Sequence, residues 1–165
     1  IEELDQQVIH TLRYVPAIGE GESGKLAIHR YATEARSAVI EKPAYHALVV
    51  DDSPTIQTLM RVTLHALEIG SDIAETGEQA LEKLHERTYD IAFFDVVLPG
   101  NINGYKLCKL AKSRQESRLM PVIMLTSKDS PFDRVRGKMS GADSYLTKPV
   151  EPSVVEAEIR TYLKL

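Results

Sequence analysis

The sequence predicts an α/β fold: a doubly wound five-stranded parallel sheet with helices on both faces, preceded by an N-terminal helical or irregular extension. Two observations predict it. From His46 onward, short β-branched and apolar runs alternate with segments whose apolar residues recur at helical spacing. Five such strand–helix units within about 120 residues call for a parallel sheet that is covered on both faces. Right-handed crossovers then leave few arrangements of the strands.

The first unit begins with an expected strand over 47–50. All of its residues are apolar, which is typical of a strand that is buried on both faces. Ser53 and Pro54 follow as the expected N-cap and first residue of a helix. Apolar residues then recur at helical spacing until Gly70, which we expect to stop this helix.

The four later units repeat this alternation. We expect strands over 72–74, 90–94, 121–125 and 144–147. The helices that follow them are indicated by apolar residues at helical spacing, namely Ala80, Leu81 and Leu84; Leu107, Leu110 and Ala111; Phe132, Val135 and Met139; and Val155, Ile159 and Tyr162. The second helix is expected to span 77–87, and Gly141 is expected to end the fourth.

Residues 1–45 lack the regular strand–helix alternation of the main domain, which we expect over 46–165. An amphipathic helix is expected over Ile1–Val15, a short strand over 25–31 and a short helix over 32–40. Two interpretations of this extension stay open. It can be an interaction arm, or the tail of an upstream domain.

Composition and charge exclude several classes of protein. The 165 residues are 43% hydrophobic and 27% charged, as in a globular protein. No apolar run approaches the roughly 18 residues of a membrane span. Lysine and arginine are scattered and the net charge is −4, so direct contact with nucleic acid is not expected. The single cysteine, Cys108, cannot form an internal disulfide; it fits a cytoplasmic location and is expected to be buried.

Polar residues are concentrated where the expected strands end. Asp51 and Asp52 follow the first strand, Asp95 the third, Thr126 the fourth and Lys148 the fifth. In open parallel sheets, ligands bind beyond the carboxyl ends of the strands. Three carboxylates that meet there repel one another unless a cation joins them, and Mg²⁺ prefers hard oxygen ligands. Each residue alone would be an ordinary turn, cap or surface residue, but their joint position favours a site.

The order of these residues resembles the receiver domain of two-component response regulators. The residues that carry the resemblance are the segment Leu48–Ser53, Asp95, Leu98, Pro99, Gly104, Thr126, Ser127, Lys148 and Pro149. The resemblance covers His46 to Leu165, nearly three quarters of the chain. It implies a flavodoxin-like sheet with the strand order 2-1-3-4-5.

The resemblance also implies the chemistry. Asp95 would accept a phosphoryl group from a phosphohistidine of a histidine kinase or phosphotransfer protein. Lys148 would pair with Asp95 and then with the phosphoryl oxygens, and Thr126 would hydrogen-bond one of those oxygens. The protein would therefore be a phosphoacceptor switch rather than a turnover enzyme.

A magnesium site is part of the same resemblance. Asp52, Asp95 and the backbone carbonyl of Val97 would bind Mg²⁺ directly, and Asp51 would act mainly through a bound water. The sequence departs from the family between Asp95 and the glycine that opens the third helix. The family commonly has seven residues there, and this chain has eight, Val96–Asn103. The conformation of this loop stays open.

The resemblance implies two further residues, Tyr145 for the switch and Pro149 beside the lysine. Phosphorylation would draw Thr126 toward the phosphoryl group, and Tyr145 would turn into the space that is left. Pro149 corresponds to a cis-proline that aims the preceding lysine. The face made of the fourth helix, fifth strand and fifth helix would change, and it is a possible homodimer interface.

Two other functions are alternatives to this one. The first is a receiver-like interaction module that never carries phosphate; the acidic pair, Asp95, Thr126 and Lys148 argue against it. The second is an enzyme of the haloacid-dehalogenase type. It would need an aspartate two residues after the nucleophile, where this chain has Val97.

Overall fold

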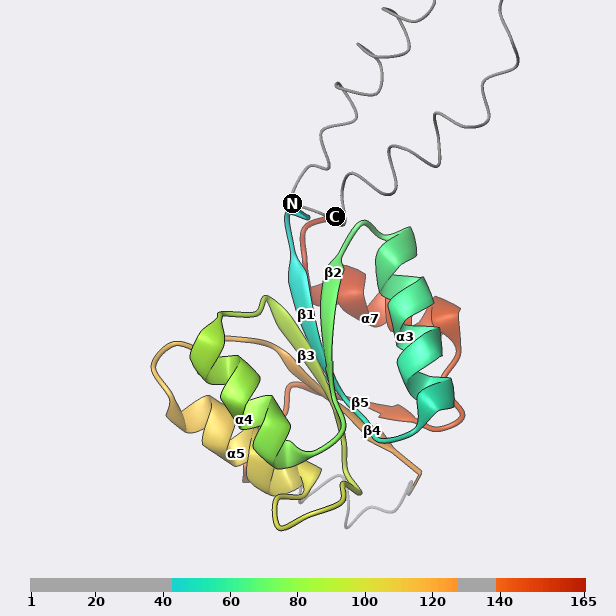
Figure 1. Cartoon of the computed structure of the whole chain (residues 1–165). Coiled ribbons are helices and arrows are strands. Elements are labelled where there is room, and N and C mark those ends of the chain that lie inside the picture. Colours follow the sequence, from blue (N-terminus) through green and yellow to red (C-terminus); the bar gives the residue numbers. More distant parts are fainter. Residues whose placement is uncertain (1–42, 128–138) are drawn as a thin grey trace, which may run out of the picture. The chain divides into compact units, whose positions relative to one another are not determined.

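Five described strands form one parallel sheet (Figure 1). In the computed structural model, which describes residues 43–127 and 139–165, the strand order is β2-β1-β3-β4-β5. Every neighbouring pair is parallel. The strands are β1 His46–Val50, β2 Gly70–Ala74, β3 Ile91–Asp95, β4 Val122–Thr126 and β5 Ser144–Thr147. The predicted fold class and strand order are confirmed.

Helices cover both faces of this sheet. The described helices are α3 Pro54–Ala66, α4 Gly77–Glu86, α5 Gly104–Ser113 and α7 Pro152–Tyr162. α3 and α7 lie on one face, and α4 and α5 lie on the other (Figure 1). The four helices thus lie on the faces of the sheet, and in open sheets of this kind ligands bind beyond the carboxyl ends of the strands.

Two apolar cores lie against the two faces of the sheet. In β1, Leu48 and Val50 belong to the core beneath α4 and α5, whereas Ala47 and Val49 belong to the core beneath α3 and α7. All four side chains are fully buried. Successive side chains of a strand point to opposite faces, so a strand between two helical layers must be apolar throughout. Cys108 is also fully buried, as expected.

The end of α3 differs from the prediction that Gly70 stops the helix. α3 ends earlier, and Glu68 turns the chain with a left-handed φ of 58°. The N–H of Ile69 donates to the carbonyl of Leu64 at 3.0 Å, which satisfies a carbonyl of the last helical turn. Gly70 is the first residue of β2, where a Cβ would lie 2.3 Å from Nδ1 of His46. The glycine therefore serves the packing of β2 against β1.

Two further details differ from the prediction. Ser53 is the N-cap of α3, but its side chain makes no capping hydrogen bond. β3 and β4 each end one residue later than predicted, so Asp95 and Thr126 are the last residues of their strands. Both side chains therefore belong to the sheet, which positions a functional group more precisely than a loop does.

Several predictions fall on residues outside the described ranges. They are the helix over Ile1–Val15, the elements over 25–31 and 32–40, and the part of the fourth helix that carries Phe132 and Val135. The chain forms a compact unit from Pro43 to Leu165, and the domain boundary at residue 46 stays a prediction. Within the described ranges, no helix is both long enough and apolar enough to cross a membrane.

Candidate functional site

Three carboxylates meet at the carboxyl ends of β1 and β3. Asp51 and Asp52 follow β1, and Asp95 ends β3. One oxygen of each carboxylate lies within 4.8 Å of the others. β1 and β3 are neighbours in the sheet, and this adjacency brings the three residues together. Asp51 is fully buried and Asp95 is 7% exposed, whereas Asp52 is exposed, so this acidic cluster opens to solvent at Asp52.

Lys148 supplies positive charge to the acidic cluster. Its Nζ donates to Oδ2 of Asp51 at 2.7 Å and lies 3.1 Å from Oδ2 of Asp95. The backbone N–H of Lys148 donates to the carbonyl of Thr126 at 2.7 Å, which ties the end of β5 to β4. The Lys148–Pro149 peptide bond is cis. The family resemblance implied a pair with Asp95, and the structure adds the shorter contact with Asp51.

The electrostatics of the cluster favour a cation. Burial raises the pKa of Asp95, and the Asp51 carboxylate acts in the same direction, although Lys148 opposes them. Burial acts to lower the pKa of Lys148, but its hydrogen bonds to Asp51 and Asp95 outweigh this effect and raise the pKa. The charge of Lys148 does not balance three carboxylates, so a bound divalent cation would stabilise their ionised forms.

Backbone N–H groups orient two of the carboxylates. The N–H of Ser53 donates to Oδ1 of Asp51 at 2.8 Å, and the N–H of Val97 donates to Oδ1 of Asp95 at 3.3 Å. The Oδ2 atoms of both carboxylates thus face Lys148. Nε2 of Gln57 also donates to the backbone carbonyl of Asp51 at 2.8 Å. The sequence did not indicate Gln57, because glutamine is common on exposed helix faces and carries no signal of its own.

Thr126 and Tyr145, the expected switch residues, lie on neighbouring strands. Thr126 is 4% exposed and pairs in register with Thr147, the residue before Lys148. Tyr145 is half-buried and packs against the core beneath α4 and α5. Burial raises the pKa of Tyr145 to about 12, with a contribution from Tyr105.

The loop Val96–Asn103, between β3 and α5, is where the sequence departs from the family pattern. Its base is closed by the N–H of Gly104, which donates to the first carbonyl of the loop at 3.0 Å. Its tip is held by Glu78 of α4, whose Oε1 accepts from the N–H of Asn101 at 3.1 Å. The sequence showed that the loop is long, but nothing in it indicated that Glu78 reaches the tip.

The donors of the acidic cluster fit a hard divalent cation. Carboxylate oxygens suit Mg²⁺, whereas zinc and copper sites prefer nitrogen or sulfur donors. Mg²⁺ keeps several of its waters, and the exposed side at Asp52 offers room for them. The structure therefore brings together Asp51, Asp52 and Asp95, and the use of the Val97 carbonyl stays a prediction.

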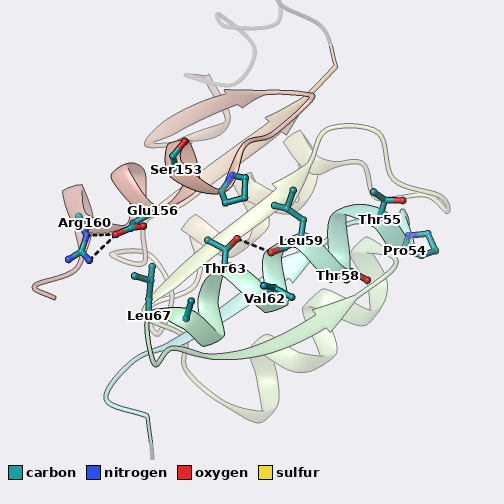
Figure 2. Close-up of a pocket in the computed structure, with 12 residues that line it drawn as sticks. Pro54, Thr55, Thr58, Leu59, Val62, Thr63, Leu67, Ser153, Glu156 and Arg160 are labelled. Carbon is teal, nitrogen blue, oxygen red and sulfur yellow. Dashed lines mark hydrogen bonds and ion pairs between the residues drawn. The ribbon is translucent and has the colours of Figure 1, made fainter.

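A groove between α3 and α7 is a separate concave surface (Figure 2). Its volume is about 1060 Å³, and its walls include Leu59 and Val62 of α3 and Glu156 and Arg160 of α7. Arg160 and Glu156 form an ion pair at 2.9 Å and satisfy each other. The acidic cluster does not line this groove. The candidate site is therefore the acidic cluster at the strand ends, where charged groups converge. The groove is concave, but the described residues that line it hold no such cluster of reactive groups.

The doubly wound parallel sheet with the strand order 2-1-3-4-5 defines a flavodoxin-like class of α/β protein, and in this chain carboxylates and a lysine lie at the carboxyl ends of its strands. Residues 47–160 match the family of the response regulator receiver domain. The chain belongs to this family, and this part of it is a receiver domain of the two-component type.

Relatives and solved structures agree with this assignment. The chain is 39% identical over 117 residues to the alkaline phosphatase synthesis transcriptional regulatory protein PhoP of Bacillus subtilis, covering 71% of this chain and 48% of that protein. Chemotaxis protein CheY4 of Vibrio cholerae superposes with a TM-score of 0.69 at 28% identity, covering 72% of this chain and 98% of that one.

A third similar protein is the receiver domain of sensor histidine kinase PA1611 from Pseudomonas aeruginosa. Its TM-score is 0.67 at 25% identity, covering 73% of this chain and 98% of that one. The crystal structure of that domain has a magnesium ion coordinated in its active site cleft. The chain spans about half the length of the first curated relatives that it matches.

Proposed function

We propose that the protein is a phosphoacceptor switch in which Asp95 takes up the phosphoryl group. One observation carries the proposal: Asp51, Asp52 and Asp95 present oxygens within 4.8 Å of one another, and Lys148 contacts two of these residues. The donor would be a phosphohistidine of a histidine kinase or phosphotransfer protein, the partner class of receiver domains. The reaction would take place in the cytoplasm.

In the proposed reaction, a carboxylate oxygen of Asp95 attacks the phosphorus of the phosphohistidine. A P–O bond to Asp95 forms while the P–N bond breaks, and the imidazole leaves with the electron pair and takes a proton from water. The Lys148 ammonium, 3.1 Å from Asp95, favours the ionised nucleophile and would then face the phosphoryl oxygens. The Thr126 hydroxyl would donate to one of them. Positioning and charge stabilisation account for this type of catalysis.

Asp51, Asp52 and Asp95, with the Val97 carbonyl, are the residues that would hold Mg²⁺. When bound, the cation would supply charge that offsets the negative phosphoryl oxygens. The chain fixes two of the donors in advance, because backbone N–H groups of Ser53 and Val97 already bind Asp51 and Asp95. The magnesium ion in the related PA1611 domain supports this part of the proposal.

The output of the switch would be a change at its partner face. Thr126 would move toward the new phosphoryl group, and Tyr145 would turn inward behind it. An added anion would thus bias a packing arrangement that has two states. The face would comprise β5, α7 and the predicted helix that carries Phe132, Val135 and Met139. A homodimer through this face is part of the proposal.

Intact-mass measurement after incubation with acetyl phosphate and Mg²⁺ tests the proposed function. The wild type is expected to gain the mass of one phosphoryl group, and neither the Asp95→Asn variant nor a sample with excess EDTA is expected to gain it. Asp90→Asn, an exposed aspartate just before β3, is the matched control and is expected to be modified like the wild type. An unchanged wild-type mass would favour the alternative, an interaction module that is never phosphorylated.

A further inference from the structure

The first turn of α4 contacts the tip of the loop Val96–Asn103. Oε1 of Glu78 accepts a hydrogen bond from the N–H of Asn101 at 3.1 Å. The same carboxylate lies over Gly100, where a Cβ would be 2.9 Å from Oε2. Gly100 has a φ of +91°, a conformation that glycine adopts without strain. The tip is therefore a tight backbone turn. The Glu78 carboxylate packs over Gly100 and accepts the hydrogen bond of the Asn101 N–H.

A second contact joins the same two elements. Ile102 packs directly on the backbone of Gly77, because a Cβ at Gly77 would lie 2.6 Å from Cγ2 of Ile102. Ile102 is half-buried and packs against the core beneath α4 and α5. Gly77 and Glu78, which are consecutive in α4, thus contact Ile102 and Asn101 of the loop.

The base of the loop is fixed independently of α4. The N–H of Gly104 donates to the carbonyl of Val96 at 3.0 Å, and a Cβ at Gly104 would lie 2.1 Å from the carbonyl oxygen of Asp95. Val97 lies between the fixed base and the fixed tip, and its N–H donates to Asp95. A loop of eight residues can adopt many backbone conformations. Contacts at its tip exclude some of them, and they therefore restrict the orientation of the Val97 carbonyl.

We infer that Glu78 is a positioning residue for the metal site. Glu78 would act through the loop, by accepting the hydrogen bond of Asn101, rather than by touching the cation. The reach of its side chain would then matter more than its charge. The inference rests on the proposed function, because it takes Asp95 and the Val97 carbonyl as cation ligands.

Two conservative substitutions separate reach from charge. Glu78→Gln keeps the length and the Oε1 acceptor but removes the charge. Glu78→Asp keeps the charge, and with it the favourable interaction with the helix N-terminus, but is one methylene too short to reach the loop. Glu82→Asp, at an exposed position of the same helix, is the matched control for the shortening.

The first measurement is calorimetric titration of the metal-free full chain with Mg²⁺. We expect Glu78→Asp to weaken binding by about three- to tenfold, the size of one lost hydrogen bond that orients a ligand. Glu78→Gln and Glu82→Asp are expected to stay within about twofold of the wild type. The second measurement is amide hydrogen exchange without metal, in which Glu78→Asp is expected to speed exchange over Val97–Asn103.

A Glu78→Asp variant that binds Mg²⁺ like the wild type, or that leaves exchange in the loop unchanged, would overturn the inference. Weakening by Glu78→Gln as large as that by Glu78→Asp would also overturn it, because the charge would then be the active property. A wild type that binds no Mg²⁺ would instead remove the proposed function on which the inference rests. The two failures are therefore distinguishable.

Discussion

Lys148 joins two carboxylates whose surroundings differ. Asp51 is fully buried, and its Oδ2 lies 2.7 Å from the ammonium, whereas Asp95 is slightly exposed and lies 3.1 Å away. A buried carboxylate that loses its cation has neither water nor a counter-charge to stabilise it. Lys148 therefore contributes to the folded state as well as to the proposed chemistry.

Replacing Lys148 by methionine is expected to lower the free energy of unfolding in EDTA by about 1–3 kcal/mol, because it leaves Asp51 buried without its partner. Urea unfolding measures this loss, and Lys106→Met, at an exposed position of α5, is the control. Added Mg²⁺ should recover part of the loss by replacing the missing charge. A Lys148 variant as stable as the control would contradict this account.

Val97 is an exposed apolar residue, 60% accessible, two positions after Asp95. We hypothesise that its β-branched side chain hinders the water that would hydrolyse the acyl phosphate. Val97→Asn is expected to speed dephosphorylation several-fold, because an amide can hold a water where valine excludes it. Following the loss of phosphoryl mass over time checks this, and an unchanged or slower rate in the variant would refute it.

The site residues differ in how readily the sequence predicts them. Asp51, Asp52 and Lys148 follow strands and Asp95 ends one, and parallel strands bring such positions to one edge, so their proximity was predictable. Glu78 was not, because its contact depends on the path of an irregular loop rather than on any periodic pattern.

At the level of elements, a polar cluster around Asp72 of β2 brings together side chains from β1, β2 and the segment before β3. The hydroxyl of Tyr89, just before β3, donates to Oδ2 of Asp72 in β2 at 2.7 Å. Nε2 of His46, in β1, lies 3.4 Å from the same oxygen, and Nη1 of Arg87 lies 3.7 Å from it. Asp72 therefore links the edge strand β2 to the start of β3 by a hydrogen bond, and it also lies close to His46 of β1.

The pKa of Asp72 makes this cluster sensitive to acid. Burial acts to raise the pKa of Asp72, but Tyr89, His46 and Arg87 outweigh it and hold the pKa below the ordinary value of 3.8. A carboxyl with a lowered pKa in the folded chain stabilises the fold above its ordinary pKa. That contribution is lost as the pH falls through the folded pKa.

Asp72→Asn is therefore expected to be less stable than the wild type near pH 7, with a difference that shrinks as the pH falls below about 4. Urea unfolding at several pH values measures it. Glu75→Gln, at the exposed position that follows β2, serves as the control. A difference between Asp72→Asn and wild type that stayed constant with pH would show that the charge of Asp72 is not responsible.

The described elements were predictable where a local pattern fixes them. The continuous apolar run of β1 follows from burial on two faces, and the helix start at Pro54 follows from its own fixed φ. The end of α3 was not predictable, because Glu68 takes a left-handed conformation that its side chain does not favour. Contacts between residues that are distant in sequence, such as Tyr89 and Asp72, were also not predictable, because they produce no periodic pattern in the sequence.

For the whole molecule, both apolar cores lie within the compact unit from Pro43 to Leu165. A fragment of residues 43–165 is therefore expected to fold alone and to unfold in one cooperative urea transition, as single domains of this size do. Circular dichroism at increasing urea concentration checks this. A broad transition without a folded baseline would show that the unit depends on the preceding residues.

The hydroxyl of Tyr45 donates to the carbonyl of Lys164 at 3.1 Å, so the polypeptide enters and leaves the unit at neighbouring points. These points lie by the amino end of β1, remote from Asp51 at its other end. A circular permutant is therefore feasible: a short peptide could join residues 43 and 165, and new ends could be opened at exposed Leu119, between α5 and β4. Such a rearranged chain would keep every strand pairing and leave the acidic edge unchanged.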